Sequence, residues 1–118
     1  MAEYTDKTGA TVTVERSGST DAFEVRDASG ETAGHADFLE VGGERIFHHT
    51  VVDEKFGGRG IGTALVRGAL EATRSEGVTI VPVCSMVEGF LGKNADDFSG
   101  AYREVTDQDR ARAGGEDG

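Results

Sequence analysis

The sequence has almost no residues that could hold its fold together covalently. Its 118 residues include one cysteine, Cys84, one proline and no tryptophan. A single cysteine excludes an intramolecular disulfide and any zinc site built from several cysteines. The fold must therefore be stabilised by a hydrophobic core, and Cys84 is either part of that core or a chemically active thiol.

Positive charge and long apolar runs are also scarce. Twelve Lys and Arg stand against 22 Asp and Glu, which gives a formal net charge of −10. This charge repels phosphate backbones and anionic headgroups, so it argues against nucleic acid or a membrane as a partner. No apolar run approaches the roughly 20 residues that span a bilayer, and residues 1–6 have neither a basic nor an apolar region. We expect a cytoplasmic protein.

The excess of acidic residues comes with a bias in the choice of basic and aliphatic residues. Nine of the twelve basic residues are Arg, and Ala, Gly, Val and Thr take the place of larger aliphatic residues. That balance is typical of halophilic proteins, whose surface carboxylates keep them hydrated while concentrated salt screens the repulsion. An ordinary acidic protein is the alternative. The length supports one domain, as a monomer or a homodimer.

Hydrophobic alternation predicts four antiparallel strands in the first half of the chain, with turns at 28–31 and 42–43. Apolar residues then repeat at a helical spacing, which predicts an amphipathic helix over 60–76 that ends at Gly77, before a fifth, buried strand. The return from the fourth strand to the fifth requires a parallel, right-handed crossover, so the fold class is α+β with a mostly antiparallel sheet. The predicted strands cover residues 11–16, 22–27, 32–41, 45–52 and 78–84.

Beyond the fifth strand, the pattern predicts short helices at 85–92 and 96–102. Residues 106–118 are charged, contain several glycines and have almost no large apolar side chains. Such a segment cannot bury enough surface to offset its ordering entropy. We therefore expect a domain over residues 1–105 followed by a disordered acidic tail over 106–118.

The segment from Phe56 to Thr63 is the most informative, because it joins the fourth strand to the helix and holds four glycines. Without β-carbons, its backbone N–H groups and the positive end of the helix dipole can converge on a phosphate, and Arg59 can add a charged donor. A dinucleotide fingerprint or a P-loop fits poorly, since the P-loop Lys-Ser/Thr pair is absent and four antiparallel strands precede the loop. A tight structural turn is the other alternative.

Residues 52–65 resemble the acetyl-coenzyme A pyrophosphate loop of the GNAT N-acetyltransferases. His49-Thr50-Val51-Val52 and the segment 80–85 resemble the minimal single-domain branch of that superfamily, which has a His-Thr-x-Val strand and a Pro-x-Cys strand end. The resemblance covers residues 10–95 and implies the GNAT fold and transfer of an acetyl group from acetyl-coenzyme A to an amine. It implies coenzyme-binding residues at Val51, Val52, Gly57, Gly58, Arg59, Gly60, Ile61, Gly62 and Thr63.

Two features depart from the family pattern. Most GNAT loops carry an Arg or Gln where this chain has Gly57, and Arg59 can replace part of that contact. The stretch 94–98 stands where the family often has a His-Pro-Glu-Tyr-like sequence. Acceptor-binding residues are therefore not carried over, and the amine acceptor is unassigned.

Acetyl transfer needs a deprotonated amine, a polarised thioester carbonyl and a proton donor for the departing thiolate. The resemblance selects His49 as the general base, since His48 and His49 alternate across the strand and only one can face the cleft. The backbone N–H of Val51 or Val52 would face the carbonyl. Cys84 would accept the acetyl group, act as the acid that protonates coenzyme A, or simply fill the core.

The three histidines have neither the spacing nor the cysteine partners of a zinc site, so no metal is expected. Two rival functions stay open. One is a non-catalytic module that binds acyl-coenzyme A, and the other is a small interaction protein whose glycine loop is only structural.

Overall fold

The computed structural model describes residues 2–113. In chain order its elements are β1 (Ala2–Thr5), β2 (Thr11–Arg16), β3 (Ala22–Arg26), β4 (Thr32–Val41), β5 (Glu44–Val52), η1 (Glu54–Phe56), α1 (Ile61–Ser75), β6 (Thr79–Pro82), α2 (Ser85–Lys93), η2 (Ala95–Phe98) and α3 (Asp107–Arg112). The five predicted strands, the amphipathic helix and the helix at 85–92 are present, with ends shifted by at most two residues. No helix within residues 2–113 is long and apolar enough to cross a membrane.

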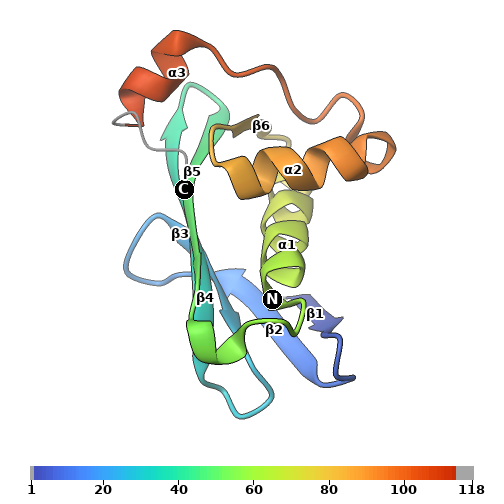
Figure 1. Ribbon diagram of the computed structural model, residues 1–118. Helices are drawn as coiled ribbons and strands as arrows, with labels where there is room; N and C mark the ends of the chain where they lie inside the picture. The colour runs from blue at the N-terminus through green and yellow to red at the C-terminus, as the bar shows by residue number, and fades with distance from the viewer. Residues whose placement is uncertain (1, 114–118) are drawn as a thin grey trace.

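The six strands form one sheet in the order β1 to β6. All neighbouring pairs are antiparallel except β5 and β6, which run parallel. Figure 1 shows the sheet curling around α1, with α1 and α2 on the same side of β4 and β5. The chain leaves β5 through the glycine loop, crosses in α1 and returns in β6, so the loop lies at the end of a strand that has neighbours on both sides.

The predicted position of the parallel pair in the strand order was wrong. The fourth and fifth strands of the sheet pair antiparallel, and the parallel pairing joins the fifth and sixth. The difference comes from β1, which the sequence pattern did not predict and which pairs with β2 through Ala2↔Val14 to Thr5↔Thr11. A four-residue strand whose one large apolar residue is Tyr4 gives too little alternation to be recognised.

Two apolar clusters lie on the two faces of the sheet. The larger one packs the inner face against α1 and α2 and includes Phe23, Phe38, Phe47, Leu65 and Phe90. In it α1 approaches β2 closely at Gly68, where an added β-carbon would lie 2.7 Å from the Val14 side chain. The smaller cluster of Ile46, Val81 and Val83 is covered by Val105 and Ala113 from the C-terminal segment.

The structure differs from the prediction of a disordered tail over residues 106–113. Thr106 caps α3, and a capping box joins its side chain and backbone to Asp109. Arg103 bridges Asp109 and Glu44, with contacts of 2.6 to 2.8 Å. This clamp and the covered apolar cluster anchor a segment whose composition alone indicates disorder. The remainder of the predicted tail, 114–118, lies outside the described residues.

Candidate coenzyme and catalytic site

The glycine loop begins after η1 and ends at the first turn of α1. Phe56 is 4% exposed and anchors η1 in the core. Gly58 and Gly60 have φ of 78° and 76°, in the left-handed region that favours glycine. Gly60 is the N-cap of α1, and no side chain caps the helix or places an acidic group in its first turn. The first backbone N–H groups of α1 are therefore available to an anion.

The remaining loop positions contribute in different ways. Gly57, Gly58 and Thr63 are exposed, and Gly62 is half-buried. Ile61 is 1% exposed and packs in the core, so it can offer a ligand only its backbone N–H. The predicted coenzyme residues of the loop thus lie together at one end of α1, mainly as backbone donors.

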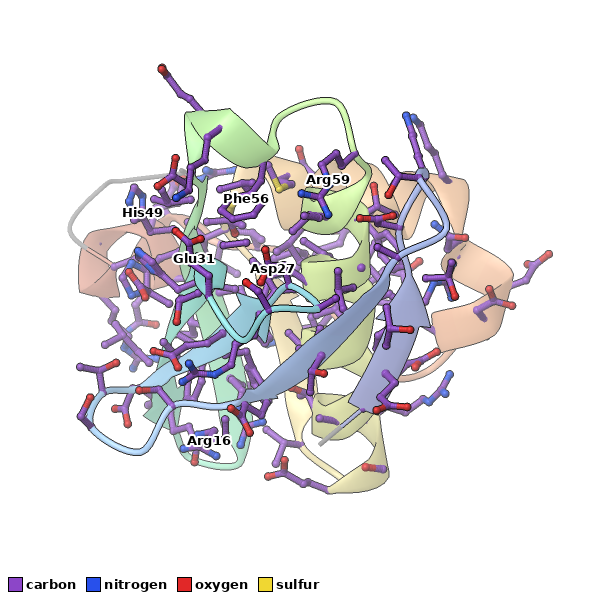
Figure 2. All side chains as sticks on the ribbon, turned by 90° about the horizontal axis from the view of Figure 1, so that it is seen from below. Arg16, Asp27, Glu31, His49, Phe56 and Arg59 are labelled. Atoms are coloured by element: carbon purple, nitrogen blue, oxygen red, sulfur yellow. The ribbon has the colours of Figure 1, made fainter. Side chains whose placement is uncertain are left out.

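Arg59 is not directed freely at this loop. Its Nη2 and Nε lie 2.9 and 3.2 Å from Oδ2 of Asp6, whose side chain is fully buried. Its guanidinium also lies 5.4 Å from the centre of the Phe56 ring. Figure 2 shows Arg59 beside Phe56, below the loop that leads into α1. The sequence prediction of a charged donor at the loop did not include this partner, because Asp6 is 53 residues away along the chain.

Asp6 is held as a carboxylate by its surroundings. It accepts hydrogen bonds from the Thr8 hydroxyl at 2.6 Å and from the N–H groups of Thr8 and Ala10. The Thr8 hydroxyl first, and then Arg59 and these N–H groups, outweigh the cost of burial and lower the pKa of Asp6 from its usual 3.8 to about 2.

This lowered pKa predicts how Asp6→Asn changes acid stability. A carboxylate whose folded-state pKa is depressed stabilises the fold above its unfolded pKa and loses that contribution as the pH falls through the folded value. We expect Asp6→Asn to lower Tm by several degrees at pH 7, and the difference from the wild type to shrink between about pH 4 and pH 2. Thermal melts across this range measure it, and a gap that is constant down to pH 2 contradicts the assignment.

β5 and β6 separate before α2 begins. Their pairing ends at Phe47↔Pro82, after which the Cys84 N–H still donates to the Phe47 carbonyl at 2.8 Å and the chain turns into α2. Gly62, in the first turn of α1, lies next to the end of β5 and the start of α2, since an added β-carbon would lie 3.4 Å from Val52 and 3.6 Å from the Met86 sulfur. Val51 and Met86 are the exposed large apolar side chains of the described residues, at 38% and 42%.

The two predicted valines differ in their orientation. Val52 packs against the core next to α1, whereas Val51 lies exposed on the other face. The Asp53 N–H donates to the Ala33 carbonyl of β4. Because hydrogen-bond direction alternates along an antiparallel strand, the Val51 N–H also points to β4 and the Val52 N–H points to the side where β6 has diverged.

His49 lies on the outer face of the sheet, away from α1. Its ring centre is 6.3 Å from that of His35, whose Nδ1 lies 2.9 Å from Oδ1 of Asp37. The predicted simple alternation of His48 and His49 was wrong, because the register shifts at this point: His49 pairs with Asp37 and Phe47 with Phe38, which leaves His48 as a bulge. The buried Nδ1 of His48 has no hydrogen-bond partner within residues 2–113.

Cys84 lies on the opposite side of β5 from His49. The residue is 0% exposed and packs in the cluster against α1. Its sulfur is 3.2 Å from the hydroxyl oxygen of the buried Thr50. Since Thr50 and His49 are consecutive strand residues, their side chains point to opposite faces, so the strand separates the imidazole from the thiol.

Sequence reasoning therefore missed three side chains next to the candidate catalytic groups. Thr50 contacts Cys84, and the pair of His35 and Asp37 stands beside His49. Thr50 stood within the quoted strand motif, but a threonine in a strand carries no signal of its partner. Among residues 2–113 no group of three or more His, Cys, Asp or Glu is placed to hold a metal ion.

A sequence model described as GCN5-related N-acetyl-transferase matches residues 22–99, which is more than half of the chain. The matched region runs from β3 to η2 and includes the glycine loop, His49 and Cys84, while β1, β2 and α3 lie outside it. No curated protein matches the chain. The curled mixed sheet, the parallel crossover through a glycine loop and the matched family together place this chain in the GCN5-related N-acetyltransferase family.

Proposed function

We propose that this protein transfers the acetyl group of acetyl-coenzyme A to an amine. The observation that carries the proposal is the uncapped N-terminus of α1, which is formed by glycines and adjoins Val52 of β5 and Met86 of α2. A pyrophosphate bound by the N–H groups of residues 60–63 would leave the rest of the coenzyme beside Val52 and Met86. The loop would supply hydrogen-bond donors to the anion, and Val52 and Met86 would supply apolar contacts.

The two faces of β5 support a division of roles between the acceptor and the coenzyme. His49, with His35 and Asp37 beside it, would receive the amine on the outer face and remove its proton as a general base. The Val52 N–H would donate to the thioester carbonyl oxygen as negative charge develops there. Cys84, on the inner face, would give a proton to the departing coenzyme A thiolate.

The protons balance over one cycle. The amine nitrogen forms a bond to the acetyl carbon while the carbon–sulfur bond of the thioester breaks. His49 takes one proton from the amine, and the coenzyme thiolate gains one from Cys84. Each group then returns to its starting state by exchange with solvent, so the net products are an acetylated amine and free coenzyme A.

Cys84 has a stronger case as an acid than as an acyl carrier. A sulfur that is fully buried and hydrogen-bonded to Thr50 has no free approach for a thioester carbon. Proton donation forms no bond to the cysteine sulfur, so it requires a smaller opening of the residues that cover Cys84, one that brings the departing sulfur within hydrogen-bond distance of the thiol. Because this thiol is buried, a non-catalytic module that binds coenzyme A is an alternative that the experiment must also test.

The deciding experiment measures thiol release from acetyl-coenzyme A against a panel of polyamines, small amines and peptide amines at high and low salt. We expect amine-dependent release that His49→Gln lowers by about 100-fold at pH 7, the lower range for loss of a general base. His48→Gln is the matched control in the same bulge and should retain most activity.

Other outcomes separate the rivals. Stabilisation by coenzyme A without turnover on any amine would favour the binding module. No stabilisation by coenzyme A in a thermal melt would favour a purely structural loop. A large loss of activity in His48→Gln with no loss in His49→Gln would identify His48 as the general base.

A further inference from the structure

The turn between β1 and β2 lies directly against the glycine loop. The backbone N–H of Lys7 donates to the carbonyl of Arg59 at 2.7 Å, and Asp6 binds the Arg59 side chain. Asp6 also accepts the three hydrogen bonds from Thr8 and Ala10 that shape the turn. A segment outside the matched family region is thereby fixed at the start of α1.

The side chain of Lys7 extends over the N-cap of α1. Its Cγ lies 3.0 Å, and its Cδ and Cε each 3.5 Å, from the position of a β-carbon at Gly60. The ammonium is one bond beyond Cε, so it lies near the end of the helix where the backbone N–H groups of the first turn are open. The absence of a side chain at Gly60 is what leaves room for this approach.

Lys7 and Gly60 also line one cavity, of about 320 Å³, together with Thr63 and Arg67. The Arg67 guanidinium already has other partners. Its nitrogens lie 3.8 and 4.0 Å from the carboxylate oxygens of Glu71 and Asp97, and 3.4 Å from the side-chain oxygen of Asn94. Lys7 is exposed, and within residues 2–113 it forms no salt bridge. It is thus a cation beside the loop whose charge is not already offset by a carboxylate.

Electrostatics explain why such a cation is needed. The chain has a net charge of −10, and coenzyme A is itself polyanionic. The charge of Arg59, which sequence reasoning assigned to the phosphates, is offset by the buried carboxylate of Asp6. Backbone N–H groups alone then leave the pyrophosphate without a full positive charge nearby.

We propose that Lys7 supplies that charge, with its ammonium pairing with the pyrophosphate of coenzyme A at the N-terminus of α1. The salt bridge between Arg59 and Asp6 then acts indirectly, by holding the turn that carries Lys7. This inference rests on the proposed function, since it assigns a residue to the same coenzyme site.

The test compares Lys7→Met with the wild type in calorimetric binding of coenzyme A and of 3′-dephospho-coenzyme A. Methionine keeps the apolar stem over Gly60 and removes the charge. We expect about a tenfold weaker affinity for both ligands, a typical value for one charge-assisted contact, and a smaller loss at high salt. Lys7→Arg should restore most of the affinity. Lys93→Met, at the last turn of α2, makes the same change in net charge and should bind as the wild type does.

Each outcome decides the proposal. Equal losses for the two ligands support pairing with the pyrophosphate. A loss for coenzyme A alone overturns that assignment and moves the contact to the 3′-phosphate. Unchanged affinity in Lys7→Met, or an equal loss in Lys93→Met, overturns a specific role for Lys7. If the wild type binds neither ligand, the proposed function fails instead.

Discussion

Replacing Gly62 by valine is expected to abolish coenzyme binding while the protein stays folded. Gly62 does not have a left-handed backbone, and its β-carbon would meet Val52 and Met86 only at ordinary contact distances of 3.4 Å and beyond. The valine methyl groups would project further between β5 and α2, into the space where we propose that the coenzyme lies. We expect at least a 100-fold loss of affinity for coenzyme A, on the order of 3 kcal/mol.

Gly89 provides a matched control for this substitution. It lies exposed on α2, with no atom within 4 Å of an added β-carbon, so Gly89→Val introduces the same β-branched residue into a helix at a position that contacts neither Val52 nor Met86. Circular dichroism and Tm should be similar for the two variants, and only Gly62→Val should lose binding in calorimetry. Wild-type affinity in folded Gly62→Val would show that the coenzyme does not pass beside Gly62.

Gly60 is less suited to this purpose, although it lies at the centre of the loop. Its φ of 76° is strained for any other residue, and a side chain there would push against Lys7. A loss of binding in a Gly60 variant would therefore mix three causes: backbone strain, a displaced turn and a blocked site. A substitution at Gly62 tests the blocked site alone.

The sequence was most informative where local pattern and function coincide. Alternation located the strands from residue 11 onward, and the spacing from Ile61 to Ala72 located the helix, because both patterns follow from burial of one face. The glycine loop was recognisable because its four closely spaced glycines, between a strand and a helix, are visible in the local sequence. These features are short-range, and they sufficed to predict the α+β class and the location of the loop.

What the sequence did not reveal depends on contacts between distant residues. The partner of Arg59 is Asp6, in the turn that follows a strand too short to be predicted, and this pairing changes which cation can serve the phosphates. The bulge at His48 alters the alternation on which the choice between two histidines was based. Arg103 orders α3 through Glu44, 59 residues earlier. None of these contacts leaves a periodic signal.

The position of Cys84 leads to the second large expected effect. If the thiol protonates the departing coenzyme, Cys84→Ala should lower kcat by about 100-fold at pH 7, as for removal of a general acid. Its affinity for coenzyme A should stay within a few-fold of the wild type, because the phosphate contacts lie at the loop. A core residue without a catalytic role would instead lower Tm and leave kcat nearly unchanged.

Two further measurements separate the acid from the acyl carrier. The buried sulfur beside Thr50 predicts that intact-mass analysis of the wild type with acetyl-coenzyme A finds no acetyl adduct on Cys84. Thr50→Val removes the hydroxyl and keeps the thiol, so it should retain more activity than Cys84→Ala. An acetyl adduct that forms on the wild type and is absent from Cys84→Ala would establish a covalent route and contradict the role of Cys84 as a general acid.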